Sequence, residues 1–264
     1  MSAGLHLVRL KVDTRKLYNF ARRARVGSHD FDEGYAVHAL LAALFDHDAG
    51  DTERFAPKPF HVASNEQHDG ASANRPHTRD LQVLGYASHD HQALRERAEM
   101  FADPSAWDLF AIDDMVSKPM PSTFPVGMKL GFEVRVCPVV RIAQRGPMTG
   151  PGEVDAFLAR AWEVGSETTL RREDVYKEWL ANELAKGGAK VVDASVQNFS
   201  IRKVHRLHHG ATRRAHAAKL PDATLVGVLE VGDADGFVGL LKRGLGRHRA
   251  FGFGMLLLKP ARQT

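Results

Sequence analysis

The chain has 264 residues, 44% of them hydrophobic and 26% charged, a composition typical of a folded globular protein that excludes disordered, collagen-like and disulfide-rich classes. Its single cysteine, Cys137, excludes an intramolecular disulfide, and its formal net charge of +4 gives only weak support for a polyanionic partner. No apolar run approaches the roughly 20 residues of a membrane-spanning helix, and the N-terminal residues lack a signal-peptide pattern, so we expect a cytoplasmic protein.

The first half of the chain predicts a mixed domain of strands and helices. Residues 5–12 alternate apolar and polar side chains as a strand does, and an irregular basic stretch is expected from there to Gly34. The next element is a helix that Asp32 or a neighbouring residue can cap, with apolar residues at helical spacing between Val37 and Phe45. Further along, we expect strands at 58–63 and 81–87, a helix at 89–101, and a proline-rich linker at 104–125.

The second half predicts the same order of elements. We expect a strand at 129–136, a helix at 172–186, strands at 190–204 and 224–231, a helix at 233–243 and a strand at 251–258. The order strand, helix, strand, strand, helix, strand is that of a ferredoxin-like unit. The sequence therefore predicts an α+β fold of two tandem ferredoxin-like (RRM-like) βαββαβ domains, at residues 1–124 and 125–264.

Positive charge is concentrated in three segments of the chain. Residues 194–221 contain no Asp or Glu and are expected at the tip of a hairpin, a second cluster occupies 242–249, and a third occupies 15–25. Solvated loops and a polyanion-binding surface both account for such clusters. The candidate binding residues in the hairpin and in the third cluster are Arg202, Lys203, Arg206, Arg213, Arg214, Lys219, Arg22, Arg23 and Arg25.

The glycine-rich segment 244–254 follows a helix and precedes a strand. It does not match a dinucleotide fingerprint, whose third glycine would stand where this chain has Arg249, and the chain has no P-loop ending. Glycines let backbone N–H groups approach a phosphate closely, and a helix cap would explain only the first two of them. The candidate phosphate-binding residues here are Gly244, Gly246, Arg247, His248, Arg249, Gly252 and Gly254.

Tyr35 and His38 stand three residues apart on the first long predicted helix, so their side chains point about 60° apart. An imidazole and a phenol so placed can serve proton transfer near neutral pH, although a pair at the edge of the core has the same spacing. His205, His208 and His209 form the only candidate metal group, and no Cys or carboxylate accompanies them. We therefore expect no metal and no cofactor.

Several segments resemble the CasE family, the CRISPR RNA endoribonuclease subunit of the type I-E Cascade complex. They are LHLVRL, GYAVHALLAALF, PKPFHV, FEVRVCPVVR, REDVYKEWLANEL with GGAKV, and LLKRGLGRHRAFGFGMLLLKP, spread between residues 5 and 260. The resemblance implies two ferredoxin-like domains and metal-independent cleavage of precursor CRISPR RNA at the 3′ base of the repeat hairpin. It further implies a 2′,3′-cyclic phosphate product that stays bound, with the other Cascade subunits as partners.

The same resemblance implies a role for the helical pair. The family carries a tyrosine and a histidine three residues apart on its first helix, which correspond to Tyr35 and His38. His38 would transfer a proton, as acid or base, and Tyr35 would orient the 2′-OH or the phosphate. The alternatives are a subunit that binds the RNA hairpin without cleaving it and a metal-dependent nuclease that uses the histidines. Insertions near 65–79, 102–124 and 145–170 would contact other subunits or form loops.

Overall fold

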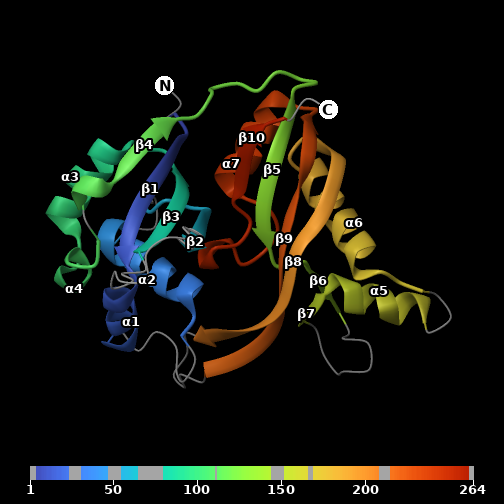
Figure 1. The fold of residues 1–264 in the computed structure, drawn as a ribbon, viewed down its shortest axis with the longest axis horizontal. Helices are drawn as coiled ribbons and strands as arrows, with labels where there is room; N and C mark the ends of the chain where they lie inside the picture. The colour runs from blue at the N-terminus through green and yellow to red at the C-terminus, as the bar shows by residue number, and fades with distance from the viewer. Residues whose placement is uncertain are drawn as a thin grey trace, which may run out of the picture. The chain divides into compact units, whose positions relative to one another are not determined.

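The computed structural model describes residues 4–23, 31–46, 55–64, 80–110, 112–143, 152–165, 169–207 and 215–261, with the backbone alone at 64, 80, 203–207 and 215–218. Contacts within the chain divide it into two units (Figure 1). Unit 1 comprises Met1–Ser122 and Ala250–Gly252, and unit 2 comprises Thr123–Arg249 and Phe253–Thr264. Three residues of the glycine-rich segment therefore belong to the N-terminal unit.

Unit 1 is a four-stranded antiparallel sheet with helices packed against it. Its elements are β1 (His6–Asp13), α1 (Thr14–Arg23), α2 (Glu33–Phe45), β2 (Phe60–Ser64), β3 (Asp80–Ala87), α3 (His91–Phe101), α4 (Pro104–Trp107), η1 (Ile112–Asp114) and β4 (Val116–Pro119). The strand order is β2-β3-β1-β4, so the first strand lies between the third and the fourth. This is the ferredoxin-like arrangement that the order of elements predicts.

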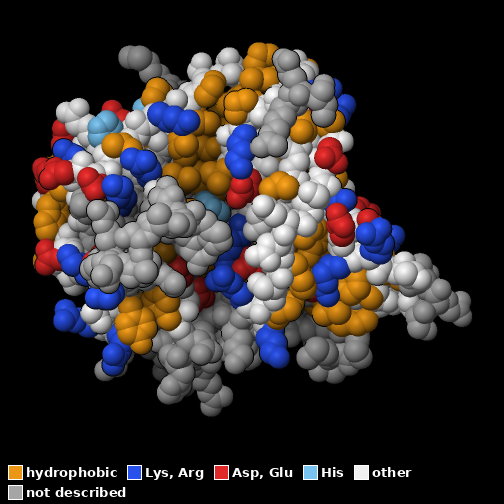
Figure 2. Space-filling model, viewed as in Figure 1, with side chains coloured by type: hydrophobic (Ala, Val, Ile, Leu, Met, Phe, Trp, Pro, Cys, Tyr) orange, Lys and Arg blue, Asp and Glu red, His pale blue; other side chains and the backbone are white. Residues whose placement is uncertain are grey.

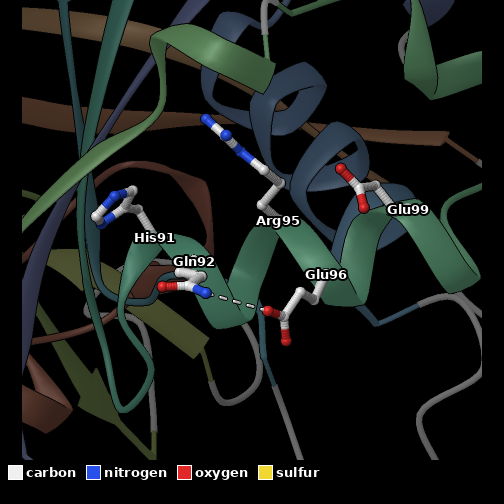
Figure 3. Close-up of a pocket in the computed structure, with 5 residues that line it drawn as sticks. All are labelled: His91, Gln92, Arg95, Glu96 and Glu99. Carbon is white, nitrogen blue, oxygen red and sulfur yellow. Dashed lines mark hydrogen bonds between the residues drawn. The ribbon is translucent and has the colours of Figure 1, made fainter.

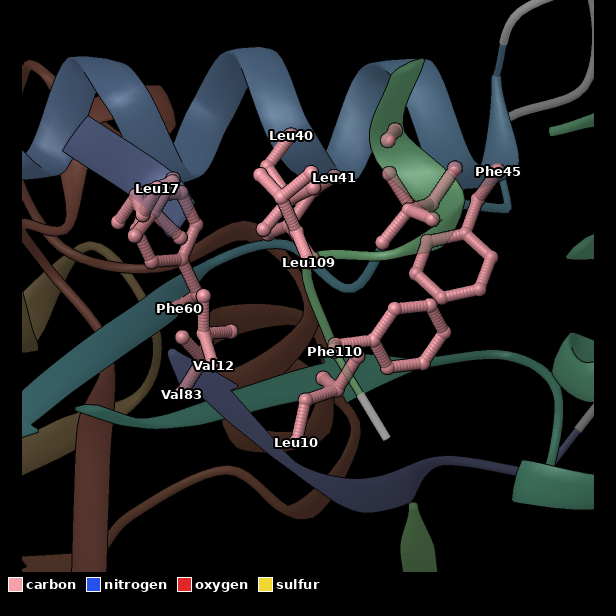
Figure 4. Packing of buried hydrophobic residues seen from close by; sticks show 14 of the residues in the cluster. Leu10, Val12, Leu17, Leu40, Leu41, Phe45, Phe60, Val83, Leu109 and Phe110 are labelled. Carbon is pink, nitrogen blue, oxygen red and sulfur yellow. The ribbon is translucent and has the colours of Figure 1, made fainter. Parts of the chain in front are cut away.

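The core of unit 1 forms because the helices and one face of the sheet present apolar side chains at matching periods. Along β1, Val8, Leu10 and Val12 alternate inward and are almost fully buried. On α2, Leu40 and Leu41 face them at helical spacing (Figure 4). Burial of each such side chain contributes about 1.5–3 kcal/mol, and it fixes which face of α2 remains outside the core.

Unit 2 has the same sheet topology. Its elements are β5 (Lys129–Val136), β6 (Val139–Ile142), β7 (Gly152–Asp155), α5 (Ala156–Val164), α6 (Arg172–Ala185), β8 (Ala189–Leu207), β9 (Ala215–Val231), α7 (Ala234–Arg243), η2 (Arg249–Phe251) and β10 (Leu256–Pro260). The four-stranded sheet has the order β10-β5-β9-β8, and β6 and β7 form a separate two-stranded sheet. Both units are therefore ferredoxin-like, and the second carries an inserted hairpin and helix.

Two expectations for the first half are wrong. The basic stretch after β1 is the helix α1, because Leu17, Phe20 and Ala21 recur at helical spacing and are buried. The expected linker contains β4, which pairs with β1 from Arg9↔Val116 to His6↔Pro119. Four residues ending in proline give little strand signal, and an edge position tolerates that proline because its missing N–H faces away from the ladder.

Two expectations for the second half also need correction. The β8–β9 ladder continues to Leu207↔Ala215, so most of the basic segment lies within paired strands and only residues 208–214, outside the described part, separate them. The last strand begins at Leu256 rather than at residue 251. Gly252 and Gly254, with φ of 82° and 78°, adopt left-handed backbone that a strand does not contain.

Candidate functional site

The start of α2 places Tyr35 and His38 on the same side of the helix. Asp32 is the N-cap: its carboxylate accepts the Tyr35 N–H at 3.2 Å and its carbonyl accepts the Ala36 N–H at 2.9 Å. Because Ala36 and Val37 are fully buried, the helix presents Tyr35 and His38 at the margin of the core, and both are partly exposed. Their ring centroids lie 6.2 Å apart.

A third ring completes this cluster. Phe251, in the part of the glycine-rich segment that belongs to unit 1, stacks on Tyr35 with a centroid distance of 5.5 Å and an interplanar angle of 22°. The same ring meets His38 edge to face, at 5.4 Å and 83°. Both distances lie in the range of favourable aromatic pairs. Phe251 therefore fixes the orientation of two side chains that alone would each rotate among rotamers.

The close approach of Phe251 depends on Gly34. A Cβ at Gly34 would lie 2.2 Å from the carbonyl oxygen of Phe251 and 3.0 Å from its carbonyl carbon. Any side chain at this position would overlap that backbone. The glycine at the second position of α2 thus allows the turn that holds Phe251 to lie directly on the helix.

The glycine-rich segment is itself held by unit 2. Leu245 N–H donates to Gly254 O at 2.8 Å and Gly254 N–H donates to Arg135 O at 2.7 Å, which closes the segment on β5. Gly246, with φ of 65°, lies against the Trp179 ring, where a Cβ would come within 2.7 Å. Gly246 and Gly254 are therefore required for packing within the protein. The sequence analysis attributed only Gly244 and Gly246 to such a structural role.

Glu153 on β7 binds two of the basic side chains of this segment. Arg247 Nε donates to Glu153 Oε1, and a ring nitrogen of His248 lies 3.0 Å from Oε2. Arg249 Nη1 donates to the carbonyl of Arg243 at 3.0 Å. Of the predicted phosphate contacts, His248 is 7% exposed at its side chain, whereas Arg247 remains about half exposed. The charge of Arg247 is therefore partly neutralised, and the two contacts with Glu153 hold the turn that leads to Phe251.

On the β8–β9 ladder, Arg202 is paired with an acid that follows the basic segment. Its Nε lies 2.6 Å from Asp222, which also accepts two hydrogen bonds from Arg135 at 2.9 and 2.8 Å. Lys219 is exposed on β9. The side chains of Lys203 and Arg206, and the whole of Arg213, Arg214 and Arg25, lie outside the described residues. Over the face drawn in Figure 2, Lys and Arg side chains stand among acidic ones rather than in one continuous field.

Arg22 and Arg23 are exposed at the end of α1, where with Asn19 they line a surface hollow of about 410 Å³. A second hollow, of about 360 Å³, lies over α3 and is lined by His91, Gln92, Arg95, Glu96 and Glu99. In Figure 3 the Gln92 amide is directed toward the Glu96 carboxylate, to which it donates a hydrogen bond at 3.4 Å. The two glutamate carboxylates in the lining of this hollow would repel a phosphate.

No group of three His, Cys, Asp or Glu side chains that could hold a metal ion occurs within the described part of the chain. His208 and His209 of the candidate metal group fall outside that part, and only the backbone of His205 is described. Among the described helices, none is both long and apolar enough to cross a membrane.

Comparison with known proteins places the chain in a family. A family model described as "CRISPR associated protein" matches residues 5–260, nearly the whole sequence. The chain belongs to this CRISPR-associated family. No curated protein matches it in a direct sequence search.

Solved structures of CRISPR-associated proteins share its fold. The CRISPR endoribonuclease Cse3 bound to a 19-nucleotide RNA has 17% identity and a TM-score of 0.61, covering 97% of this chain and all of the other. Cse3 of Thermus thermophilus, bound to an RNA that represents a pre-cleavage complex, gives 17% and 0.59 over the same shares. Cas6e of Escherichia coli gives 17% and 0.55, again with 97% and 100% coverage. At these identities the likeness concerns the fold.

The structure brings together Tyr35 and His38, and it adds Phe251, which the sequence analysis did not single out. The sequence does contain a signal for Phe251, because a large apolar residue there interrupts a run of basic and glycine residues between Arg249 and Gly252. The sequence analysis placed Phe251 at the start of the last strand. Only the fold shows that the turn carrying it lies on α2, because residue 251 is more than 200 positions away in sequence.

Proposed function

We propose that this chain is a metal-independent endoribonuclease that cuts CRISPR precursor RNA within its repeats. The observation that carries the proposal is the ring cluster that Tyr35 and His38 of α2 form with Phe251 of the glycine-rich segment. The cluster lies in a chain of the CRISPR-associated family whose fold is that of proteins named as endoribonucleases and described bound to RNA. The proposal includes a cytoplasmic location, retention of the cut RNA and assembly with other Cascade subunits.

The reaction requires of the site only proton transfer and correct orientation of the RNA. The 2′-oxygen attacks the adjacent phosphorus, the bond from phosphorus to the 5′-oxygen breaks, and a 2′,3′-cyclic phosphate forms. One proton must leave the 2′-OH and one must reach the departing 5′-oxygen, and His38 carries one of these two protons. The hydroxyl of Tyr35 orients the 2′-OH or a phosphate oxygen, and the Phe251 ring holds both groups in place.

Binding of the RNA rests on the exposed cations. Phosphates supply most of the contacts that a duplex RNA stem offers, because its major groove is deep and narrow. Arg22, Arg23 and Lys219 are exposed, and Arg247 remains about half exposed despite its contact with Glu153. We assign these side chains to phosphate contacts. Arg202 can join them only by weakening its ion pair with Asp222.

The remaining predicted contacts belong to the same proposal. Lys203, Arg206, Arg213 and Arg214 extend the β8–β9 hairpin surface along the chain, and Arg25 extends the α1 cluster. The backbone N–H groups of the glycine-rich segment and the side chains of His248 and Arg249 complete the set. Since His248 is largely buried, its part is to hold the segment.

The test is single-turnover cleavage of a repeat RNA from the source genome in the presence of EDTA. We expect wild type to cut once per repeat and to leave a cyclic phosphate, His38→Ala to lose about 100-fold or more in rate, and Tyr35→Phe to lose less. His91→Ala, which changes a histidine on another helix of unit 1, is the matched control and retains the wild-type rate. Tight binding without any cleavage by wild type would instead assign a non-catalytic RNA-binding subunit.

A further inference from the structure

Two large aromatic side chains lie exposed beside each other in unit 1. Tyr18 on α1 is 45% exposed and Phe31, just before α2, is 39% exposed, with ring centroids 5.4 Å apart at an angle of 59°. The apolar face of α1 is made instead by Leu17, Phe20 and Ala21, which are buried. Tyr18 and Phe31 therefore contribute less to the core than residues of their size usually do, and the exposed parts of both rings are accessible to a ligand.

Positive charge surrounds this aromatic pair. The guanidinium of Arg22 lies 5.9 Å from the centroid of the Tyr18 ring, and Arg22, Arg23 and Asn19 line the hollow of about 410 Å³. Neither arginine has an ion pair with any described carboxylate. In Figure 2 an apolar patch with Lys and Arg side chains around it lies over the position of α1 in Figure 1. Cations without an acidic partner among the described residues, next to exposed rings, are typical of surfaces that bind single-stranded nucleic acid.

The pair also lies close to the proposed active site along the chain. Phe31 directly precedes Asp32, the N-cap of α2, and stands four residues before Tyr35. Because Phe31 and Asp32 precede the helix, the four residues can span at most about 14 Å even when the chain is extended. An RNA strand whose scissile phosphate lies at Tyr35 and His38 can therefore reach the aromatic pair within a few nucleotides.

We propose that Tyr18 and Phe31, with Arg22 and Arg23, form a stacking site for unpaired nucleobases next to the scissile phosphate. The rings stack on the bases without reading their sequence, and the two arginines bind the flanking phosphates. This inference rests on the proposed function. A nucleic acid fits the surface better than a protein segment does, because the exposed large apolar residues among those described between 4 and 46 are only these two rings.

The experiment compares three RNAs that share one repeat stem-loop and carry a 2′-deoxy nucleotide at the scissile position to prevent cleavage. The first ends at the stem, the second has three unpaired uridines at each end, and the third has abasic residues in place of those uridines. Binding to the full-length protein is measured at fixed salt. We expect the uridine flanks to tighten binding roughly five-fold or more over the abasic flanks, because only the former can stack.

Substitutions locate the effect. Tyr18→Leu with Phe31→Leu abolishes the difference between uridine and abasic flanks and leaves the affinity for the blunt stem unchanged, whereas Tyr18→Phe preserves the difference. Trp107→Leu, which removes another exposed aromatic ring of unit 1, is the matched control and has no effect. With 5-iodouridine in the flanks, photocrosslinking is expected at Tyr18 or Phe31.

The outcomes separate this inference from the proposed function. Failure of the blunt stem to bind would refute the proposed function. A blunt stem that binds, with equal affinities for uridine and abasic flanks, would refute the stacking site alone. The stacking site is equally refuted if the double substitution leaves the flank effect intact, or if it impairs only assembly with a protein subunit.

Discussion

Gly34→Ala is the substitution that tests most sharply whether Phe251 is held against α2. Alanine is normally the better helix former by about 1 kcal/mol. Here its Cβ would lie 2.2 Å from the carbonyl oxygen of Phe251, and a contact of 3.0 Å is the shortest that real Cβ atoms show. The turn at residues 250–252 would have to move by about 0.8 Å or more. Overpacking of this kind costs about 1–3 kcal/mol, so the net effect is a loss of stability of up to about 2 kcal/mol.

The larger effect is expected on catalysis. The displaced turn carries the ring that orients Tyr35 and His38, and a misplacement of about 1 Å can cost about 100-fold in rate. Single-turnover cleavage and urea unfolding are measured for Gly34→Ala and for Gly239→Ala, a helical glycine on α7 with nothing within 4 Å of its Cβ position. The control gains about 0.5–1 kcal/mol of stability and keeps its cleavage rate. Gly34→Ala with wild-type stability and rate would refute the reasoning.

Three further predictions concern the same framework. Phe251→Leu lowers the single-turnover rate about ten-fold or more with little change in RNA affinity, whereas Phe251→Tyr, which keeps an aromatic ring, retains the wild-type rate. If Phe251 had only a structural role, both substitutions would lower the rate to the same extent. Asp222→Ala removes the two carboxylate hydrogen bonds of the Arg135 guanidinium, which is 12% exposed, and costs about 3 kcal/mol in urea unfolding, whereas Glu133→Ala at an exposed pair costs less than about 1 kcal/mol. The Ala93 N–H lowers the pKa of Asp90, so Asp90→Ala costs about 1 kcal/mol at pH 7. Since the folded pKa lies below the unfolded one, this cost shrinks as the pH falls below about 4, and unfolding curves that differ equally at pH 7 and pH 3 would contradict it.

The sheets were predictable from the sequence because their central strands carry a strong pattern. β1 and β5 alternate buried and partly exposed residues over eight positions, and β3 spans eight residues of similar character. Such alternation is the most reliable signal that a half-buried strand gives. The expectation of two ferredoxin-like units is confirmed by the strand orders of both sheets.

The sequence analysis missed two elements, a helix rich in charged residues and a very short strand. α1 has six polar residues among its ten, and its basic residues led to the prediction of an irregular stretch, although three buried residues at helical spacing specify the helix. β4 has four residues and takes its conformation from pairing with β1 rather than from its own propensity. A strand of this kind depends on tertiary context, which a single sequence does not contain.

The part of the candidate site that depends on local helical spacing was predictable from the sequence, and the part that depends on the tertiary fold was not. Tyr35 and His38 stand three residues apart, so helical geometry alone places them together. Phe251 reaches them only through the fold of the glycine-rich segment, whose glycines at 244, 246, 252 and 254 all have positive φ. The pairing of Arg247 and His248 with Glu153 was likewise beyond the sequence, because the acid lies over 90 positions away. Among the basic residues that the sequence predicts to bind RNA, Arg247 and Arg202 form ion pairs within the protein.

The most direct test of the central claim is the fate of a repeat RNA with a single 2′-deoxy substitution at the scissile nucleotide. If the 2′-OH is the nucleophile at the Tyr35–His38 site, this RNA binds as tightly as the unmodified repeat and is not cut, while the unmodified repeat is cut in EDTA and leaves a 2′,3′-cyclic phosphate. Cleavage of the 2′-deoxy RNA, or a requirement for added divalent metal, would contradict the account.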